Sequence, residues 1–333
     1  MRFGLAKWTE GRMRRGAGIA VVSAGVLMAP VFGLAPPAGA AAPAASGGCG
    51  VSATAGSSAL ELSLGGYLRK VIVHVPTGYS DAKPAPLVLD LHGSSSTARV
   101  QEFLSGMDST SDAHGFLVAY PQALIKSATG YSWNVPKEPL VGGAAVPKGA
   151  ANDVTFLTGV VGALSSRYCV DRTRVYATGM SGGGRMASQL ACDAPRTFAA
   201  IAPVAGLRFP QPCSSARAVP LIAFHGTADP VDPYQGHGQG YWSYSVSTAL
   251  KRWAAHERCA SRPEVTQGPG FTLTKYQGCR SGALVELYAL KGEGHEWPGG
   301  PPLPAADVAA LGPQSNAVNA DAQMWSFFSR YRL

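Results

Sequence analysis

The stretch Arg174-Val-Tyr-Ala-Thr-Gly-Met-Ser-Gly-Gly-Gly184 decides the fold, because a β-forming run ends in a glycine-rich turn and a helical run follows. The turn carries the pattern Gly-x-Ser-x-Gly over residues 179–183. Glycines leave room where strand and helix crowd together, so the hydroxyl of Ser181 is lifted above the sheet edge and the backbone N–H of Gly182 can face an oxyanion. A plain glycine-rich turn is the alternative. In this context the pattern predicts a nucleophilic serine.

A serine hydroxyl needs a base to accept its proton, and the base needs a carboxylate to orient it. The strand-like run 221–225 leads into a loop that contains Asp229, and the run 285–290 is followed by the glycine-flanked His295. We expect Asp229 to be the carboxylate, with Asp232 as the alternative, and His295 to be the base. The chain order of serine, acid and histidine is that of α/β-hydrolases.

A second oxyanion donor is expected where the run 87–91 ends in His92-Gly93 beside a loop of three serines. We assign this role to the backbone N–H of Ser94, while an ordinary strand-to-helix turn is the alternative. A preorganised donor of this kind contributes about 3 to 4 kcal/mol in the transition state. The other histidines are expected to be structural: His74, His114, His225, His237 and His256.

Short apolar runs alternate with longer stretches of helical spacing along most of the chain. The expected strands are 70–75, 87–91, 116–120, 174–178, 200–204, 221–225 and 285–290, and the expected helices are 153–168, 182–192, 243–256 and 316–331. This alternation predicts an α/β fold with a mostly parallel sheet covered on both faces. With no repeat or interdomain linker, one catalytic domain is expected over 59–333, preceded by a flexible Ala/Gly/Ser-rich arm over 41–58.

Composition excludes several classes of protein. The 333 residues are 46% hydrophobic, which excludes a disordered chain. The formal net charge is +8, but residues 1–40 contain five Lys/Arg and one Glu, so this segment supplies +4 of it. The rest of the chain has no run of basic residues interleaved with aromatic ones, so we expect no nucleic-acid partner.

The first 40 residues have the three parts of an export signal: a basic segment up to Arg15, an apolar stretch over 17–34, and Ala38-Gly-Ala40 before the expected cleavage site. A membrane anchor is the alternative, but three prolines interrupt or follow the apolar stretch. We therefore expect a secreted protein without a stable membrane anchor. The pair Arg14-Arg15 leaves both Sec and twin-arginine export open.

An even number of cysteines in an exported chain argues for disulfides, and the six cysteines here allow 15 connectivities. Nearness in the sequence favours Cys192 with Cys213 and Cys259 with Cys279, which leaves Cys49 to pair with Cys169. A lipid on Cys49 is the competing idea, but the preceding Ser46-Gly-Gly48 lacks the apolar residue that such a signal needs.

Seven motifs in order resemble the group of secreted feruloyl esterases and polyhydroxybutyrate depolymerases. These are Leu91-His-Gly93, Gln101-Glu102 with Ser105-Gly106, Tyr120-Pro121, residues 169–183, Ala202-Pro-Val-Ala-Gly206, His225-Gly-Thr-Ala-Asp229, and Gly294-His295 with Trp297-Pro-Gly299. The likeness runs from about Cys49 to the C-terminus. It implies ester hydrolysis through an acyl-enzyme, without metal or cofactor, and it supports both the triad and the disulfide pairing.

Two features depart from or extend this resemblance. Ser94-Ser95-Ser96 stands where the family often has a second glycine-rich element, and the insert at 135–150 matches no family pattern and is a candidate wall of the acyl pocket. Trp133 and Trp297 are expected to offer flat apolar faces to a phenolic ring, with core packing as the alternative.

The leading hypothesis is a secreted, monomeric serine esterase whose partner is an ester substrate, a hydroxycinnamoyl ester of plant cell-wall polysaccharide. The chain shows no separate substrate-binding module, which favours soluble feruloylated oligosaccharides or short esters over a solid polymer. A polyester hydrolase is the second hypothesis, and a non-catalytic secreted binder on the same fold is the third. An acyltransferase with the same triad is a further possibility, because water and an alcohol compete for one acyl-enzyme.

Overall fold

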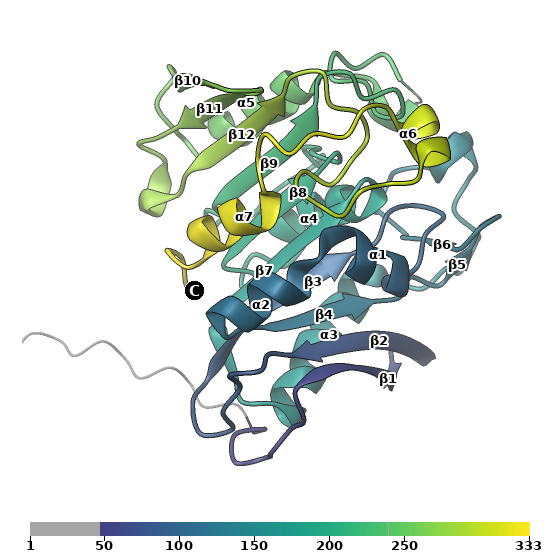
Figure 1. Ribbon diagram of the computed structural model, residues 1–333, viewed down its shortest axis with the longest axis vertical. Helices are drawn as coiled ribbons and strands as arrows, with labels where there is room; N and C mark the ends of the chain where they lie inside the picture. Colours follow the sequence, from purple (N-terminus) through teal and green to yellow (C-terminus); the bar gives the residue numbers. More distant parts are fainter. Residues whose placement is uncertain (1–46, 239) are drawn as a thin grey trace, which may run out of the picture. The chain divides into compact units, whose positions relative to one another are not determined.

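A ten-stranded sheet organises the protein, as the computed structural model shows (Figure 1). The structure describes residues 47–238 and 240–333, so the predicted export signal lies outside the described residues. In spatial order the strands are β1 (Gly56–Leu64), β2 (Tyr67–Val75), β4 (Leu117–Pro121), β3 (Ala85–Leu91), β7 (Val170–Met180), β8 (Ala200–Val204), β9 (Leu221–Gly226), β12 (Val285–Leu290), β11 (Phe271–Tyr276) and β10 (Glu264–Gly268).

The six central strands from β4 to β12 run parallel to one another, and the outer strands pair antiparallel. Five of the six are buried along their whole length, and β7 is buried except near its start. A strand buried on both faces reads as a continuous apolar run rather than an alternating one. The α/β fold predicted from the sequence is therefore confirmed.

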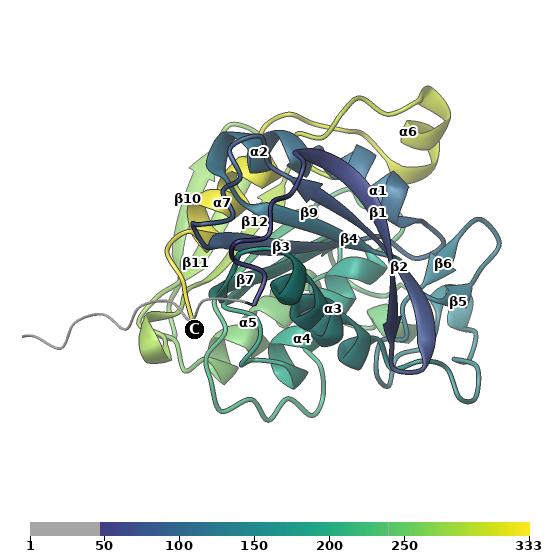
Figure 2. The same cartoon turned by 90° about the horizontal axis from the view of Figure 1, so that it is seen from below.

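Two apolar cores lie on opposite faces of the sheet, and the helices divide between them (Figure 2). One core contains residues of α3 (Asp153–Arg167), α4 (Gly182–Asp193) and α5 (Val246–His256). The other contains residues of α1 (Ala98–Ser105), α2 (Met107–His114) and α7 (Ala320–Phe328). Smaller elements are α6 (Ala305–Leu311), single 3₁₀ turns at Val141–Gly143, Gly240–Trp242 and Arg280–Gly282, and a separate hairpin of β5 (Ile125–Lys126) with β6 (Tyr131–Ser132).

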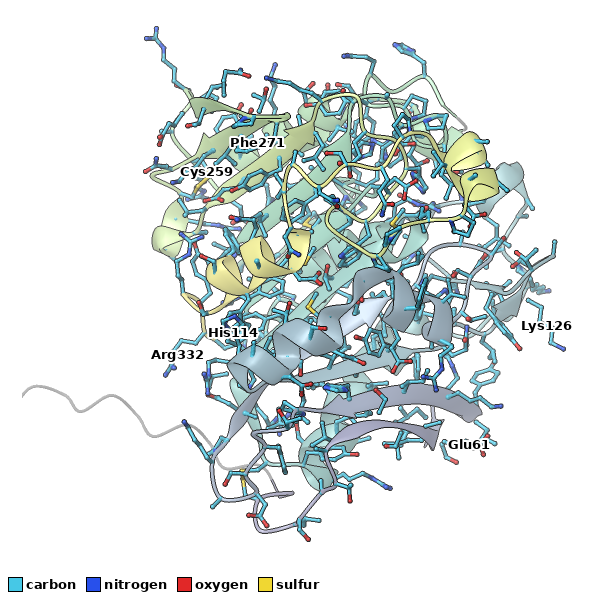
Figure 3. All side chains as sticks on the ribbon, in the orientation of Figure 1. Glu61, His114, Lys126, Cys259, Phe271 and Arg332 are labelled. Carbon is cyan, nitrogen blue, oxygen red and sulfur yellow. A yellow bond between two sulfur atoms is a disulfide. The ribbon has the colours of Figure 1, made fainter. Side chains whose placement is uncertain are left out.

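All seven predicted strands are present, but the edges of the sheet were not predicted. Residues 41–46 of the predicted arm lie outside the described residues. Over 47–58 the structure differs from the prediction, because Gly56–Ser58 already pair with β2 as part of β1 and Cys49 is disulfide-bonded. Edge strands bury little, so β1, β10 and β11 lack a long apolar run. On β1, Glu61 points to solvent near its cross-strand partner Lys70 (Figure 3).

Helices α1 and α2 were also missed, because α2 has few apolar residues and the burial of α1 inverts the usual pattern. Helix α1 buries the polar side chains of Gln101, Glu102 and Ser105, while Val100 and Phe103 are exposed. Two predicted helices start later than expected, since polar caps fix their first turns. The side chain of Ser245 accepts a hydrogen bond from Thr248 at the start of α5, and Asn319 caps α7 in the same way.

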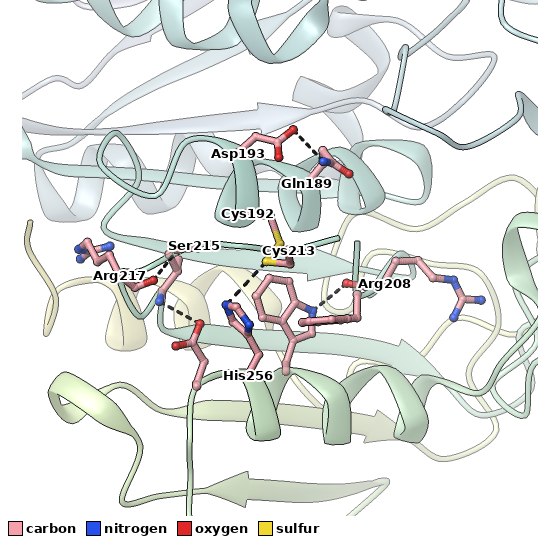
Figure 4. The surroundings of a disulfide bond; sticks show 12 residues. Gln189, Cys192, Asp193, Arg208, Cys213, Ser215, Arg217 and His256 are labelled. Carbon is pink, nitrogen blue, oxygen red and sulfur yellow. Dashed lines mark hydrogen bonds between the residues drawn. A yellow bond between two sulfur atoms is a disulfide. The ribbon is translucent and has the colours of Figure 1, made fainter. Parts of the chain in front are cut away.

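The three predicted disulfides are confirmed: Cys49–Cys169, Cys192–Cys213 and Cys259–Cys279. The second bridge ties the C-terminal end of α4 to the loop before β9, with His256 of α5 alongside it (Figure 4). Among the described residues, no helix is both long and apolar enough to cross a membrane.

Replacing Cys192 and Cys213 together by alanine should lower the free energy of unfolding. The bridge closes a loop with a sequence separation of 21 residues. Removing such a constraint from the unfolded chain costs about 3 kcal/mol. Urea unfolding of the double variant beside wild type measures the difference. An unchanged midpoint and slope would contradict a stabilising role for the bridge.

Candidate active site

The predicted serine, acid and base lie at one edge of the sheet. Ser181 follows the last residue of β7, whereas Asp229 and His295 lie in the loops just after β9 and β12. Strands β7, β8, β9 and β12 are consecutive neighbours and parallel, so their carboxyl ends share one edge. Residues that are far apart in the sequence are thereby brought to the same side of the molecule.

The backbone at Ser181 adopts a conformation that side chains rarely take, with φ 54° and ψ −115°. The Ser181 amide donates to the carbonyl of Val204 at the end of β8 (2.8 Å). A Cβ atom at Gly183 would lie 2.0 Å from the carbonyl oxygen of Leu91, so only glycine fits there. This strained strand-to-helix turn is the geometry of a nucleophile elbow.

His295 and Asp229 form a direct hydrogen bond. Nδ1 of His295 lies 2.8 Å from Oδ2 of Asp229, and both residues are buried. Because the carboxylate accepts, Nδ1 carries the proton and Nε2 is left as the basic nitrogen. No described residue forms a hydrogen bond with the Ser181 hydroxyl, so the structure joins two members of the predicted triad and leaves the third at the same edge.

Asp229, rather than Asp232, occupies the position of the orienting acid. Its Oδ1 accepts the backbone N–H groups of Val231 and Asp232, each at 2.8 Å. Asp232 instead has one carboxylate oxygen that is buried without a hydrogen-bond partner among the described residues.

A residue that the sequence analysis had treated as structural, His225, also contacts this carboxylate. Its Nε2 lies 2.8 Å from the carbonyl oxygen of Asp232 and 3.2 Å from Oδ2 of Asp229. A carbonyl oxygen can only accept, so Nε2 carries a proton that both acceptors share. The signal in the sequence was the position of His225 at a strand end, four residues before Asp229.

These contacts set the charges of the pair. Burial acts to raise the pKa of Asp229, but the hydrogen bonds from His225 and His295 outweigh it, and the pKa lies below its usual range. Burial acts to lower the pKa of His295, but Asp229, helped by the charges of Asp232 and Glu296, raises it above the ordinary value. Asp229 is therefore ionised at neutral pH, and an imidazolium at position 295 is stabilised.

The two predicted oxyanion donors lie side by side. A Cβ atom at Gly182 would lie 3.0 Å from the backbone nitrogen of Ser94 and 2.3 Å from its Oγ, so the serine loop packs against the first turn of α4. No side chain in the described part of the protein caps this helix start. Unpaired N–H groups and the helix dipole make such a position favourable for negative charge.

The loop after β3 is held by the β5–β6 hairpin and by His92. The amide of Tyr131 donates to the carbonyl of Ser96 (2.9 Å), and the hydroxyl of Thr129 donates to that of Ser95 (2.7 Å). Nε2 of His92 accepts the amide of Ala123 (3.0 Å). Burial lowers the pKa of His92 to about 4, so this ring is neutral and structural at neutral pH.

The two tryptophans expected to line the substrate pocket are buried instead, each about 3% exposed. The indole N–H of Trp133 donates to the carbonyl of His92 (2.7 Å), and its ring packs on the imidazole of His92. The indole N–H of Trp297 donates to Oδ1 of Asp321 (2.9 Å). Burial on all sides leaves no free aromatic face, so this geometry fits the core-packing alternative. Within the described part of the chain, no cluster of His, Cys, Asp and Glu could hold a metal ion.

A strained serine after one parallel strand, with an acid and a histidine after later ones, defines the class of serine hydrolases with the α/β-hydrolase fold. Residues 70–237 match the family described as Esterase PHB depolymerase. The chain belongs to this family, and it is a carboxylic ester hydrolase.

Individual relatives agree with this assignment. The chain is 32% identical to a "Putative esterase NocK" of Nocardia uniformis, over 74% of this chain and 76% of that one. It is 30% identical to "Feruloyl esterase B" of Piromyces equi, over 68% of this chain but only 42% of that protein. A solved acetyl xylan esterase from Aspergillus awamori has a TM-score of 0.56 at 17% identity, covering 82% of this chain and 99% of that one. This last likeness concerns the fold.

Exchanging each candidate acid for its amide should separate their roles. Asp229→Asn removes the acceptor that fixes the His295 tautomer, and kcat should fall by roughly 10³- to 10⁴-fold. Asp232→Asn should keep most of kcat and move the acidic limb of the pH profile of kcat/KM downward, because one negative charge that raises the pKa of His295 is lost. In wild type this limb should lie above the ordinary imidazole value of about 6.5. If instead Asp232→Asn causes the large loss of kcat and Asp229→Asn only shifts the pH profile, Asp232 is the orienting acid.

Adding one methyl group at Gly182 should damage the oxyanion site. The new Cβ would push Ser94 away, and loss of one donor typically lowers kcat by about 10²- to 10³-fold. Gly162→Ala in α3 is a matched control, because a Cβ there meets nothing within 4 Å. It should leave kcat unchanged and stabilise the helix by about 0.5 to 1 kcal/mol. Equal kcat values for the two variants would contradict the assigned oxyanion position.

Proposed function

We propose that this chain is a secreted serine esterase that hydrolyses hydroxycinnamoyl esters, such as feruloyl groups on plant cell-wall polysaccharide. The hydrogen bond between His295 and Asp229, at the sheet edge where Ser181 lies, is the observation that carries the catalytic assignment. The relative named feruloyl esterase supports the acyl specificity.

In the proposed first step, Nε2 of His295 accepts the proton of the Ser181 hydroxyl as its oxygen attacks the ester carbonyl carbon. The carbonyl oxygen becomes negative and is stabilised by the backbone N–H groups of Ser94 and Gly182. The imidazolium, oriented by Asp229, gives its proton to the departing alcohol oxygen, and an acyl-enzyme remains.

In the second step, His295 takes a proton from water, whose oxygen attacks the acyl carbon. Collapse of this tetrahedral intermediate releases the carboxylic acid and returns the proton to Ser181. The reaction uses only side chains and backbone groups that lie at the carboxyl edge of the sheet.

Secretion and the domain limits form part of the same proposal. Three disulfides support an oxidising compartment outside the cytoplasm. We infer that residues 1–40 are removed on export and that the catalytic domain, beginning close to β1, acts as a monomer.

A polyester hydrolase remains the second candidate. The family description names a depolymerase, and Val100 and Phe103 of α1 expose 43% and 62% of their surface a few residues after Ser94. Exposed apolar side chains on the helix that follows the Ser94 loop suit a solid polyester better than a soluble sugar ester.

A panel of three substrates with one variant tests the proposal. Methyl ferulate should be hydrolysed, and Ser181→Ala should lower kcat by about 10⁶-fold while thermal unfolding stays close to wild type. A fluorophosphonate should label wild type once, at Ser181. Clearing of a polyhydroxybutyrate suspension without methyl ferulate hydrolysis would support the second candidate, and hydrolysis of p-nitrophenyl butyrate alone would show an esterase of other acyl specificity. A protein that takes no fluorophosphonate would be a non-catalytic binder.

A further inference from the structure

The insert at 135–150 reaches the edge of the candidate site through one side chain. Oε2 of Glu138 accepts a hydrogen bond from Nη1 of Arg185 at 2.9 Å. Arg185 lies one helical turn after Ser181 on α4, and its side chain is about 3% exposed. A loop that matched no family pattern is thus connected to the helix that begins at the nucleophile.

The same guanidinium contacts the oxyanion loop. Nη2 of Arg185 donates to Oγ of Ser94 at 3.3 Å. No other hydrogen bond to Ser94 is formed within the described residues. The ring of Tyr241 covers the guanidinium, with 4.1 Å from the Arg185 carbon to the ring centroid. Carboxylate, hydroxyl and aromatic ring therefore hold the arginine in one place.

Ser94 needs such a partner because its loop is held mainly at its other end. The hairpin contacts described above fix Ser95 and Ser96, and Ser95 itself has a φ of 61°, which is unfavourable for a residue other than glycine. The hydrogen bond from Arg185 is the side-chain contact that fixes the residue closest to Gly182.

We propose that Arg185, held in place by Glu138, is a positioning residue for the oxyanion hole and acts through the hydroxyl of Ser94. The bond sets the direction of the Ser94 backbone N–H toward the oxygen that becomes negative. This inference rests on the proposed ester hydrolysis at Ser181, but not on the acyl group. A misplaced donor matters most in the transition state, so the effect falls on kcat rather than on KM.

Glu138 is required because a buried guanidinium is costly unless it is paired. A second buried cation, Arg208, is stacked on Trp242 nearby, with 3.1 Å to the ring centroid, and its charge affects the pKa of Glu138. Without the carboxylate of Glu138, the two arginines would repel each other and Arg185 would shift away from Ser94.

A double-mutant cycle on p-nitrophenyl acetate tests the proposal. Arg185→Met should lower kcat by about 10- to 100-fold with KM changed by less than about threefold, which is the cost of a slightly displaced catalytic group. Ser94→Ala, which keeps the backbone N–H, should lower kcat by a similar factor. The double variant should be no slower than the slower single variant, because both remove the same contact. Inhibition by phenylboronic acid, which forms a tetrahedral adduct with serine, should weaken by the factor lost in kcat/KM.

Two further variants keep the test decisive. Glu138→Gln keeps a hydrogen-bond acceptor but removes its charge, so it should lower kcat less than Arg185→Met does. Its effect should again not be additive with that of Ser94→Ala. This second double-mutant cycle tests the proposal if Arg185→Met does not fold. Lys251→Ala, at an exposed position of α5 outside the insert, should match wild type. If the losses in kcat of the two single variants multiply in the double variant, the role of Arg185 is overturned. A variant of Arg185 that raises KM and leaves kcat unchanged would overturn it too. Inactivity of wild type on every ester would refute the proposed function together with this role.

Discussion

The close approach of α4 to the end of β3 is the constraint on which the site depends. A Cβ atom at Gly179 or Gly183 would lie 2.5 Å or 2.0 Å from the carbonyl oxygen of Leu91, so the chain can turn here only without side chains. The serine between these glycines is forced into a left-handed conformation, and the hydrogen bond to Val204 keeps it there. The same approach places Gly182 beside Ser94. One packing contact therefore positions both the predicted nucleophile and the two predicted oxyanion donors.

Burial gives the acidic residues around His295 different charges. Asp229 has four donors for its two oxygens and stays ionised. Burial raises the pKa of Glu293 to about 8 and that of Glu296 to about 7, and each has a carboxylate oxygen without a partner in the described part of the chain. The imidazole thus faces the ionised carboxylate of Asp229, and the charge of Asp232 also favours the imidazolium. Neighbouring groups that are kept partly neutral allow the histidine to give up its proton as well as accept it.

The sequence predicted the features that depend on local pattern. Buried parallel strands read as apolar runs, and strand ends followed by loops marked Ser181, Asp229 and His295. The features that it did not predict depend on side-chain contacts that only the folded chain forms. His225 is a strand residue until the fold places it against Asp229. Trp133 and Trp297 are equally suited to a pocket or to a core, and only their neighbours His92 and Asp321 decide between the two.

The buried charges beside the oxyanion loop show why such contacts matter for function. Arg185 and Arg208 are about 97% and 98% buried, and burial lowers the pKa of Arg208 to about 10, so the Arg208 guanidinium remains cationic at neutral pH. The acidic groups within electrostatic reach are Glu138 and Asp232, the first from the insert and the second from the acid loop. An apolar pair would fill the same space at a lower desolvation cost. In our proposal the arginine is therefore explained by its hydrogen bond to Ser94, which positions the oxyanion loop, rather than by stability of the fold.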